Sequence, residues 1–259
     1  MLNILAITQA RTSSTRLPGK VLKKIGTHTL LELHINRILQ SKKISKLIVA
    51  TTTEVSDKAI VDLCNNIKIE SYRGSLADVL DRFYQAALPY KPDYVIRLTS
   101  DCPLIDAKVI DLVVDTMLKT KVDYCSNTIS PTYPNGLDVE VFTFAALEKA
   151  WKEAHLQSDR EHVTPYIYRN SNLMGGALFT ALNVSNSVNY EAIRLTVDEQ
   201  NDFEVISGLV NALGTAAPWE AYTEYYLKHP ELNKLNQGIN RNEGYLKSLK
   251  NDHTAKKDL

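Results

Sequence analysis

The chain has 259 residues, of which 44% are hydrophobic, and its 30 lysines and arginines balance 30 aspartates and glutamates. This length and composition suit one α/β domain with a substantial core better than two smaller domains, because no linker-like stretch divides the chain. The zero net charge argues against a broad cationic surface for nucleic acid or membrane, and without a signal-like N-terminus or a membrane-spanning apolar run we expect a cytoplasmic protein.

The first half of the chain alternates short runs of β-branched residues with longer amphipathic stretches, which is typical of a parallel sheet wrapped by helices. Thr29 and Glu32 form a capping box at the start of the first predicted helix. The apolar face of that helix consists of Leu31, Ile35, Ile38 and Leu39. Further helices are predicted over 78–88 and 109–117, and strands over Asn3–Thr8, Leu47–Thr52, Lys68–Tyr72, Tyr94–Thr99 and Val122–Asn127.

After Asn127 the pattern indicates a mixed, partly antiparallel continuation of the sheet. Ser158 and Glu161 have the spacing of a capping box, which predicts a helix that runs through His162. The predicted strands of this half are Leu137–Phe142, Ala177–Val184 and Ala192–Val197. We expect a main domain over 1–216, a helical extension packed on it over 217–250, and a disordered tail over 251–259.

The segment QARTSSTRLPGK, Gln9–Lys20, follows the first predicted strand and holds three cations, Arg11, Arg16 and Lys20, with no acid. In an open α/β sheet, ligands bind beyond the carboxyl ends of the strands, where a loop that enters a helix offers backbone N–H groups to an anion. Two guanidinium groups and an ammonium add charge that suits a polyphosphate. The alternative is a solvated basic loop. The P-loop spacing and the dinucleotide-binding fingerprint are both absent from the sequence.

This segment resembles the signature loop of the sugar-acid cytidylyltransferases, and most closely that of the spore-coat polysaccharide synthesis protein F branch. The resemblance continues through VATTTEVSDKAIVDL, YRGSLADVLDRFYQAA, RLTSDCPLID, SNTISPTYPNGLDVEVF, SDREHVTPYI and LTVDEQNDFE. It implies a nucleotide-diphospho-sugar transferase fold, Rossmann-like and of the GT-A type, with a mixed sheet of about seven strands flanked by helices. Residues 1–216 would then form the nucleotidyltransferase domain. The chain departs from the family at Ser13, where glycine is frequent, and this leaves less room for the backbone to approach a phosphate.

The resemblance implies an enzyme that joins CTP to an acidic sugar of the sialic-acid-like nonulosonic type, giving CMP-sugar and pyrophosphate for surface polysaccharide or glycan biosynthesis. It assigns catalysis to Arg11, Lys20 and Asp101. It implies that the nucleotide is bound by Gln9, Ala10, Arg11, Ser14, Arg16, Lys20, Thr51, Arg73 and Asp101. The alternatives are a nucleotidyltransferase that uses another nucleoside triphosphate or a sugar phosphate, and a non-catalytic nucleotide-binding partner of a glycan pathway.

Nucleotidyl transfer gathers negative charge on the α-phosphate and the leaving pyrophosphate, so we expect Mg²⁺ on one or two carboxylates. Asp101 follows the predicted strand Tyr94–Thr99, and Asp198 follows Ala192–Val197, so both lie at carboxyl ends. Taken alone, either aspartate would also suit a helix or turn cap. The resemblance implies that both are metal ligands. Asp202 is a weaker candidate, because an acid in a first helical turn also stabilises the helix dipole.

Asp138 and Glu140 fall on one face of a predicted strand because side chains alternate along it, although an exposed strand face would show the same pattern. The family uses the corresponding segment for its acceptor sugar, together with Arg160, Glu161 and His162. His162 could act as a general base, but it could also be structural or a sugar contact, because a metal-bound hydroxyl can lose its proton without an imidazole.

Arg73 and Arg97 could contact the nucleotide or a substrate carboxylate. The alternative is an ion pair, for which Asp78 and Asp81 are the candidate partners of Arg73.

The resemblance also implies a homodimer. Tyr222, Tyr225 and Tyr226 lie on a polar predicted helix after Pro218, and aromatic residues suit the core of an interface. The alternative is that this helix packs its tyrosines back on its own domain.

Overall fold

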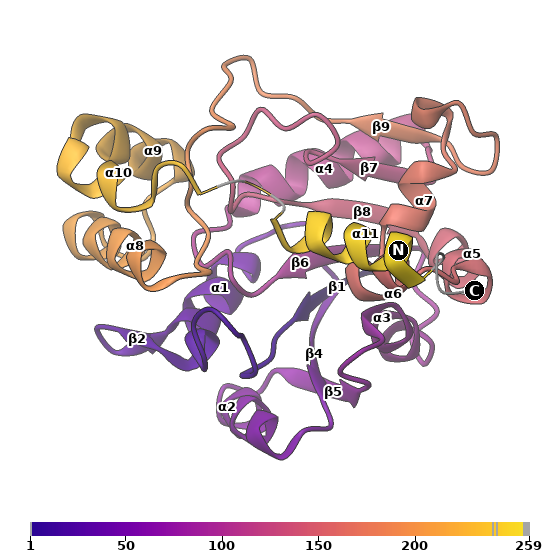
Figure 1. Cartoon of the computed structure of the whole chain (residues 1–259), viewed down its shortest axis with the longest axis horizontal. Coiled ribbons are helices and arrows are strands. Elements are labelled where there is room, and N and C mark those ends of the chain that lie inside the picture. Colours follow the sequence, from indigo (N-terminus) through magenta and orange to yellow (C-terminus); the bar gives the residue numbers. More distant parts are fainter. Residues whose placement is uncertain (1, 240, 242, 256–259) are drawn as a thin grey trace.

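A mixed sheet of seven strands forms the centre of the protein (Figure 1). The structure is a computed structural model, which describes residues 2–239, 241 and 243–255. The strands of this sheet are β1 (Ile4–Gln9), β4 (Lys46–Thr52), β5 (Glu70–Gly74), β6 (Tyr94–Thr99), β7 (Tyr124–Ser126), β8 (Glu140–Thr143) and β9 (Ala181–Asn183). They lie in the order β5-β4-β1-β6-β8-β7-β9. Neighbours β5, β4, β1 and β6 are parallel, β8 is antiparallel to β6 and β7, and β9 is parallel to β7, which confirms the predicted mixed sheet.

Helices cover both faces of this sheet. The α-helices of the described residues are α1 (Leu30–Ile38), α2 (Lys58–Asn66), α3 (Val79–Ala87), α4 (Ala107–Thr120), α5 (Phe144–Glu153), α6 (Gln157–His162), α7 (Pro165–Arg169), α8 (Gln200–Leu213), α9 (Trp219–Lys228), α10 (Pro230–Asn236) and α11 (Glu243–Ala255). Short 3-10 helices are η1 (Lys20–Leu22), η2 (Val55–Asp57) and η3 (Asn172–Met174).

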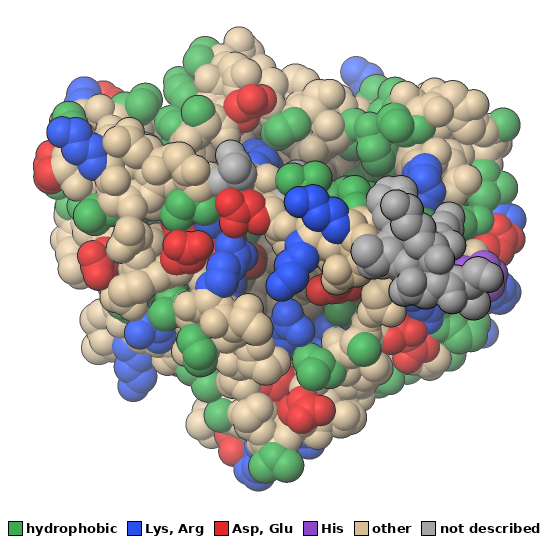
Figure 2. All heavy atoms as spheres, in the orientation of Figure 1, with side chains coloured by type: hydrophobic (Ala, Val, Ile, Leu, Met, Phe, Trp, Pro, Cys, Tyr) green, Lys and Arg blue, Asp and Glu red, His purple; other side chains and the backbone are tan. Residues whose placement is uncertain are grey.

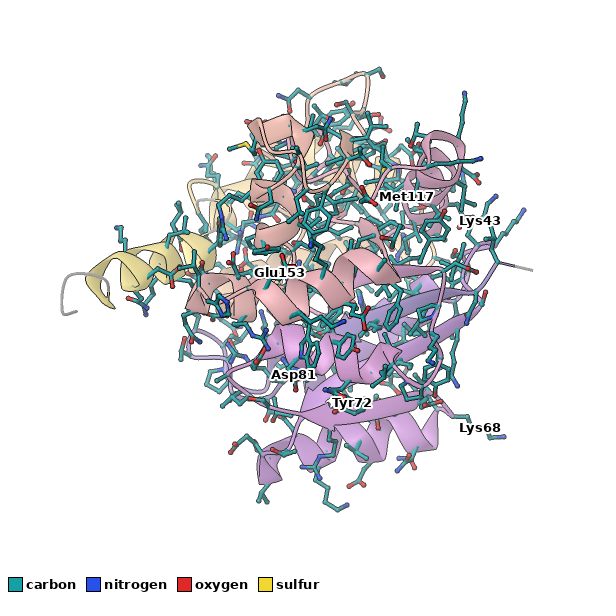
Figure 3. The ribbon with its side chains drawn as sticks, turned by 90° about the vertical axis from the view of Figure 1, so that its right-hand side faces the viewer. Lys43, Lys68, Tyr72, Asp81, Met117 and Glu153 are labelled. Atoms are coloured by element: carbon teal, nitrogen blue, oxygen red, sulfur yellow. The ribbon has the colours of Figure 1, made fainter. Side chains whose placement is uncertain are left out.

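The side chains of β1 show how the sheet divides the core. Ile4 and Ala6 pack with residues of α1, α2 and α4, whereas Leu5 and Ile7 pack with residues of α3 and α5 on the opposite face. Figure 3 shows α3 and α5, marked by Asp81 and Glu153, on the same side of the sheet. Because a buried parallel strand has apolar residues on both faces, the run Ile4–Ile7 was recognisable as a strand.

The C-terminal helices α9 and α10 pack on α8 and close a third apolar cluster. Tyr222 and Tyr226 are 0% and 4% exposed within it, and Tyr225 stacks on His229 at 3.7 Å between ring centroids. The tyrosines therefore pack on their own domain, as the alternative interpretation had it. The homodimer stays a prediction of the resemblance, without support from these side chains.

One predicted strand is wrong. Residues 192–197 belong to no strand of the sheet, because Ala192 lies in a turn and the segment forms only an isolated bridge, between Arg194 and Asn135. Their backbone bonds go to loops, because Leu195 donates to the Asn135 carbonyl and Val197 to the Asp101 carbonyl. The predicted strands over 122–127, 137–142 and 177–184 are present as the shorter or shifted β7, β8 and β9.

The capping predictions had opposite outcomes. At α1 the Thr29 hydroxyl accepts a bond from the Glu32 backbone, and the Glu32 carboxylate accepts one from the Thr29 backbone, which confirms the box. Leu39, expected on the buried face, is the C-cap of α1 and 52% exposed. The box at Ser158 is wrong, because the N-cap of α6 is Leu156, two residues earlier, and the backbone N–H of Ser158 donates to Asp252.

Two further features differ from expectation. The hairpin β2 (Lys24–Ile25) and β3 (His28–Thr29) was not predicted, although Gly26, at φ 60°, supplies the left-handed residue of its turn. Residues 251–255, expected within a disordered tail, continue α11, whose Asp252 is tied to α6, and 256–259 lie outside the described residues. No helix in the described part of the chain is long and apolar enough to cross a membrane.

Candidate functional site

A cleft of about 970 Å³ opens beyond the carboxyl ends of β1 and β6. Figure 2 shows basic and acidic side chains gathered around a hollow in the middle of this face. The cleft is lined by twelve of the residues predicted for the site: Gln9, Ala10, Arg11, Ser14, Arg16, Lys20, Asp101, Asp138, Glu140, Glu161, His162 and Asp198.

The two candidate metal ligands meet because the loop after β6 crosses the segment before α8. Val197 donates its backbone N–H to the Asp101 carbonyl at 2.7 Å, and the Thr196 hydroxyl donates to the same oxygen at 3.0 Å. This crossing places Asp101 and Asp198 around one ammonium group. The Lys20 Nζ lies 3.3 Å from Asp101 Oδ2 and 2.9 Å from Asp198 Oδ1, and it also donates to the Val197 carbonyl at 2.7 Å.

The opening loop reaches this point because it folds back on itself. Gly19 adopts φ 67°, a left-handed conformation that favours glycine, and donates its N–H to the Thr12 carbonyl at 2.8 Å. Buried Asp57 accepts bonds from the backbone and hydroxyl of Thr12 at 2.7 and 2.6 Å. These bonds fix the start of the loop, and η1 then carries Lys20 into the cleft.

Around Lys20, the two aspartates form ion pairs with nearby cations. Burial opposes ionisation of Asp101, but the Lys20 ammonium and a Thr99 hydrogen bond lower the pKa of Asp101 to about 2. Burial likewise opposes the charged form of Lys20, yet the two aspartates raise the pKa of Lys20 above its ordinary value. Asp198 also contacts Arg16 at 2.9 Å and Arg194 at 3.0 Å. Asp101 and Lys20 are therefore ionised at neutral pH.

The pair Asp101 and Asp198 fits a magnesium ion. Both carboxylates already contact a single cation, and oxygen is the donor that Mg²⁺ prefers. No group of three or more acidic, histidine or cysteine side chains suited to a metal occurs among the described residues. One or two carboxylates with phosphate oxygens and water is the usual Mg²⁺ site of nucleotide enzymes. Asp202 is fully buried, and its carboxylate accepts hydrogen bonds from the Arg194 guanidinium and from the backbone N–H groups of Asp198 and Glu199. These bonds occupy its oxygens, so Asp202 is a structural residue and not a metal ligand.

The antiparallel direction of β8 brings a second acidic group to the same edge of the sheet. Glu140, the first residue of β8, lies opposite Arg97 and forms an ion pair with it. The Glu140 carboxylate also accepts bonds from the hydroxyls of Tyr124 and Thr164, each at 2.6 Å. Burial and neighbouring acids raise the pKa of Asp138, which pairs with Arg241.

His162 faces this acidic group from α6. Burial and the positive charges of Arg97 and Arg11 lower the pKa of His162 to about 4, so the imidazole is neutral at physiological pH. Its Nε2 lies 3.0 Å from the hydroxyl of Ser248 on α11. A neutral imidazole can contact a sugar hydroxyl or accept a proton, so both interpretations of His162 stay open.

Three predicted site residues do not line the cleft. Thr51 is buried in β4. Arg73 donates to the carbonyls of Thr52 and Glu54, each at 3.0 Å, and so forms neither of the ion pairs considered for it. Arg160 forms a two-pronged ion pair with Asp78, in which its Nη2 lies 2.5 Å from Oδ2.

Arg82 was not predicted, yet it lines the cleft from α3. Its side chain is buried, 2% exposed, and its Nε and Nη1 have no hydrogen-bond partner among the described residues. Burial and the nearby Arg11 guanidinium lower the pKa of Arg82 to about 10. Arg82 lies among the apolar residues of α3 (Val79–Ala87), and this was the available signal in the sequence. A buried charge is costly without a partner, so an arginine at such a position indicates a functional role.

His34 was also missed. It is fully buried under the site, where Nδ1 donates to the Cys102 carbonyl at 2.8 Å and Nε2 lies 2.9 Å from the Thr8 hydroxyl. Burial lowers the pKa of His34 to about 4, so the ring stays neutral. It therefore ties β1 to the loop that carries Asp101.

Comparisons with known proteins identify the family of this chain. A family described as cytidylyltransferase matches residues 5–238. An uncharacterised protein of Methanocaldococcus jannaschii is 41% identical, over 92% of this chain and 96% of its own. Spore coat polysaccharide biosynthesis protein SpsF of Bacillus subtilis is 33% identical, over 83% and 89%. The structure of a cytidylyltransferase from Leptospira borgpetersenii is similar at a TM-score of 0.85 and 32% identity, over 93% of this chain and 100% of that one.

Proposed function

This chain belongs to the cytidylyltransferase family and is a CTP-dependent nucleotidyltransferase, and we propose that its acceptor is an acidic sugar, activated as a CMP-sugar for surface polysaccharide or glycan synthesis. One observation carries the proposal. The cations of the opening loop and the aspartate pair line one cleft together with a second group, the acids Asp138, Glu140 and Glu161 and the neutral His162. We call the part beside Lys20 the phosphate end, which suits a triphosphate, and the part beside the second group the acceptor end, which suits sugar hydroxyls.

In the proposed reaction an acceptor hydroxyl oxygen attacks the α-phosphorus of CTP. A new P–O bond forms, the bond from the α-phosphorus to the bridging oxygen breaks, pyrophosphate leaves with that electron pair, and the hydroxyl releases its proton to solvent, directly or through the neutral imidazole of His162. Arg11, Arg16 and Lys20 hold the phosphates in line for this displacement. Positioning and electrostatic stabilisation supply most of the catalysis, and no covalent enzyme intermediate is needed.

Asp101 and Asp198 would hold Mg²⁺, which supplies positive charge against the phosphates when it is bound. At the acceptor end, Asp138 is a hydrogen-bond acceptor for sugar hydroxyls, and Glu140, whose carboxylate is held by Arg97, Tyr124 and Thr164, lines the same part of the cleft. Neutral His162 lies beside them as a contact or a proton acceptor.

The proposal is tested by measuring pyrophosphate release from four nucleoside triphosphates with a panel of nonulosonic acids, including 3-deoxy-manno-octulosonate, and with sugar phosphates. We expect turnover with CTP and an acidic sugar only. If a sugar phosphate is the only acceptor that supports turnover, the acceptor is a sugar phosphate and not an acidic sugar. Binding of CTP by calorimetry without turnover on any acceptor would favour the nucleotide-binding partner instead.

Arg82 gives a prediction with two opposite readouts. We expect Arg82→Met to raise the melting temperature of the ligand-free protein, because a buried guanidinium with two unpartnered nitrogens, Nε and Nη1, is replaced by an apolar chain of similar length. We expect the same change to weaken CTP binding roughly tenfold, which is the scale of one charge-assisted contact. Differential scanning fluorimetry and calorimetry check the two effects.

The control is Arg73→Met, because Arg73 donates to backbone carbonyls and does not line the cleft. It should lower the melting temperature and leave CTP affinity nearly unchanged. A fall in the melting temperature of Arg82→Met with unchanged CTP affinity would show that Arg82 is structural.

A further inference from the structure

Helix α11 passes in front of the sheet in Figure 1, and it lies beyond residue 238, where the match to the family ends. Figure 3 shows it at one end of the sheet, apart from the helices that cover the sheet's faces. Six of its residues line the cleft: Glu243, Gly244, Tyr245, Lys247, Ser248 and Asn251. The helix is therefore a wall of the site, contributed by a segment outside the matched region.

On one side α11 is tied to α6 by polar contacts. The Ser248 hydroxyl donates to the Glu161 carboxylate at 2.8 Å and lies 3.0 Å from His162 Nε2. One turn on, Asp252 accepts the backbone N–H of Ser158 at 3.2 Å. The helix thus contacts two of the residues predicted for the acceptor.

On the other side the C-terminal segment is tied to the opening loop and to the acceptor end. Glu243 lies 3.5 Å from a guanidinium nitrogen of Arg16. Arg241, just before the helix, forms an ion pair with Asp138 and donates to the Tyr133 carbonyl at 3.3 Å. The segment therefore spans the cleft from the phosphate end to the sugar end.

The contacts that hold α11 in place are mainly polar, and the helix buries little apolar surface. Its buried side chains within the described residues are Ser248 and Asp252, both polar, and Leu246 is 52% exposed. No described residue of α11 belongs to the apolar clusters of the core. Segments with few buried apolar contacts open at a low free-energy cost.

The cleft stays large with α11 in place. Its volume of about 970 Å³ lies near the top of the range of roughly 300–1,000 Å³ that is usual for ligand sites. The helix therefore covers the site without filling it. A helix in this position can enclose bound substrates and exclude water from them.

The charges around α11 indicate what it contacts. Asp138, Glu140 and Glu161 would repel a carboxylate at the acceptor end, Arg97 is already paired with Glu140, and the imidazole of His162 is neutral. Lys247 lines the cleft next to Ser248, and within the described residues it forms no ion pair. It is thus a cation available to an acidic sugar.

We propose that α11 is a lid that completes the acceptor site, and that Lys247 binds the carboxylate of the acidic sugar. This inference rests on the proposed function. It assigns acceptor recognition to a helix outside the matched region, whereas the residues that grip CTP lie within that region.

The test uses Lys247→Ala with Lys250→Ala as the control, since Lys250 is on the same helix but does not line the cleft. We expect Lys247→Ala to raise the KM of the acidic sugar roughly tenfold, the scale of one ion pair in a partly desolvated site, and to leave the KM of CTP nearly unchanged. The control should resemble the wild type. An unchanged acceptor KM, or an equal rise in the KM of CTP, would overturn the role of Lys247.

A chain truncated after Gly238 and a hydrogen-exchange experiment test the lid itself. The truncated chain should bind CTP with nearly wild-type affinity by calorimetry and show a raised acceptor KM. In the full chain, with EDTA to prevent turnover, peptides of α11 should exchange more slowly when CTP and the acidic sugar are both present than with CTP alone. Unchanged exchange would overturn the lid. If the wild type turns over no acidic sugar at all, the proposed function fails, and that outcome is separate from a failure of the variants.

Discussion

Asp101→Asn and Asp198→Asn should each lower kcat roughly 100-fold or more at saturating Mg²⁺, while the fold is retained. Each change removes one negative charge and keeps the shape of the side chain. Both carboxylates contact the same Lys20 ammonium, at 3.3 and 2.9 Å, and we propose that both contribute to one cation site there. If either carboxylate is lost, the proposed Mg²⁺ ion is held less firmly and supplies less positive charge against the transferred phosphate.

The measurement is initial-rate pyrophosphate release, with circular dichroism and a melting curve to show that each variant folds. Asp62→Asn is a matched control, because Asp62 is a half-exposed acid paired with Lys58 on α2, away from the cleft. Near-normal turnover in both cleft variants, with the control also active, would remove the two aspartates from the catalytic site. Loss in one variant alone would leave a single carboxylate ligand.

The parallel half of the fold could be predicted because its signals are local. The buried run Ile4–Ile7 and the box at Thr29 and Glu32 depend on residues close in sequence, and both are present as predicted. Residues 192–197 have the same β-branched pattern, but their backbone groups bond to loops far away in sequence. Periodicity reports which residues are buried and extended, but it does not report the partner of each N–H group.

The candidate site could be predicted in part for the same reason. Asp101 follows β6, and the carboxyl ends of strands form the edge where ligands bind in an α/β sheet, so its place could be predicted. Asp198 follows a segment that is not a strand of the sheet, and it meets Asp101 because Val197 donates to the Asp101 carbonyl. Glu140 reaches that edge from the opposite direction, because β8 is antiparallel and begins where β6 ends. The arginine among the apolar residues of α3 was a signal in the sequence that the prediction did not use, whereas the path of α11 depends on tertiary packing, which the sequence alone did not indicate.

Lys20 is the other residue for which we expect a large effect. Lys20→Ala should weaken CTP binding roughly 100-fold and cytidine binding hardly at all. The ammonium bridges Asp101 and Asp198 and also bonds to the Val197 carbonyl. Without it, the two carboxylates face the triphosphate with no bridging cation, so attraction becomes repulsion. Cytidine carries no phosphate and does not meet this charge.

Calorimetry with CTP and with cytidine separates the two effects, and Lys24→Ala is the control, since Lys24 is an exposed lysine of β2 that does not line the cleft. Lys20→Ala should also lose stability, on the order of 3 kcal/mol, because two largely buried carboxylates lose their shared partner. Added Mg²⁺ should recover part of the melting temperature of this variant, since a divalent cation can neutralise the same pair of carboxylates. Equal weakening of CTP and cytidine, or no recovery by Mg²⁺, would contradict a shared cation site at Asp101 and Asp198.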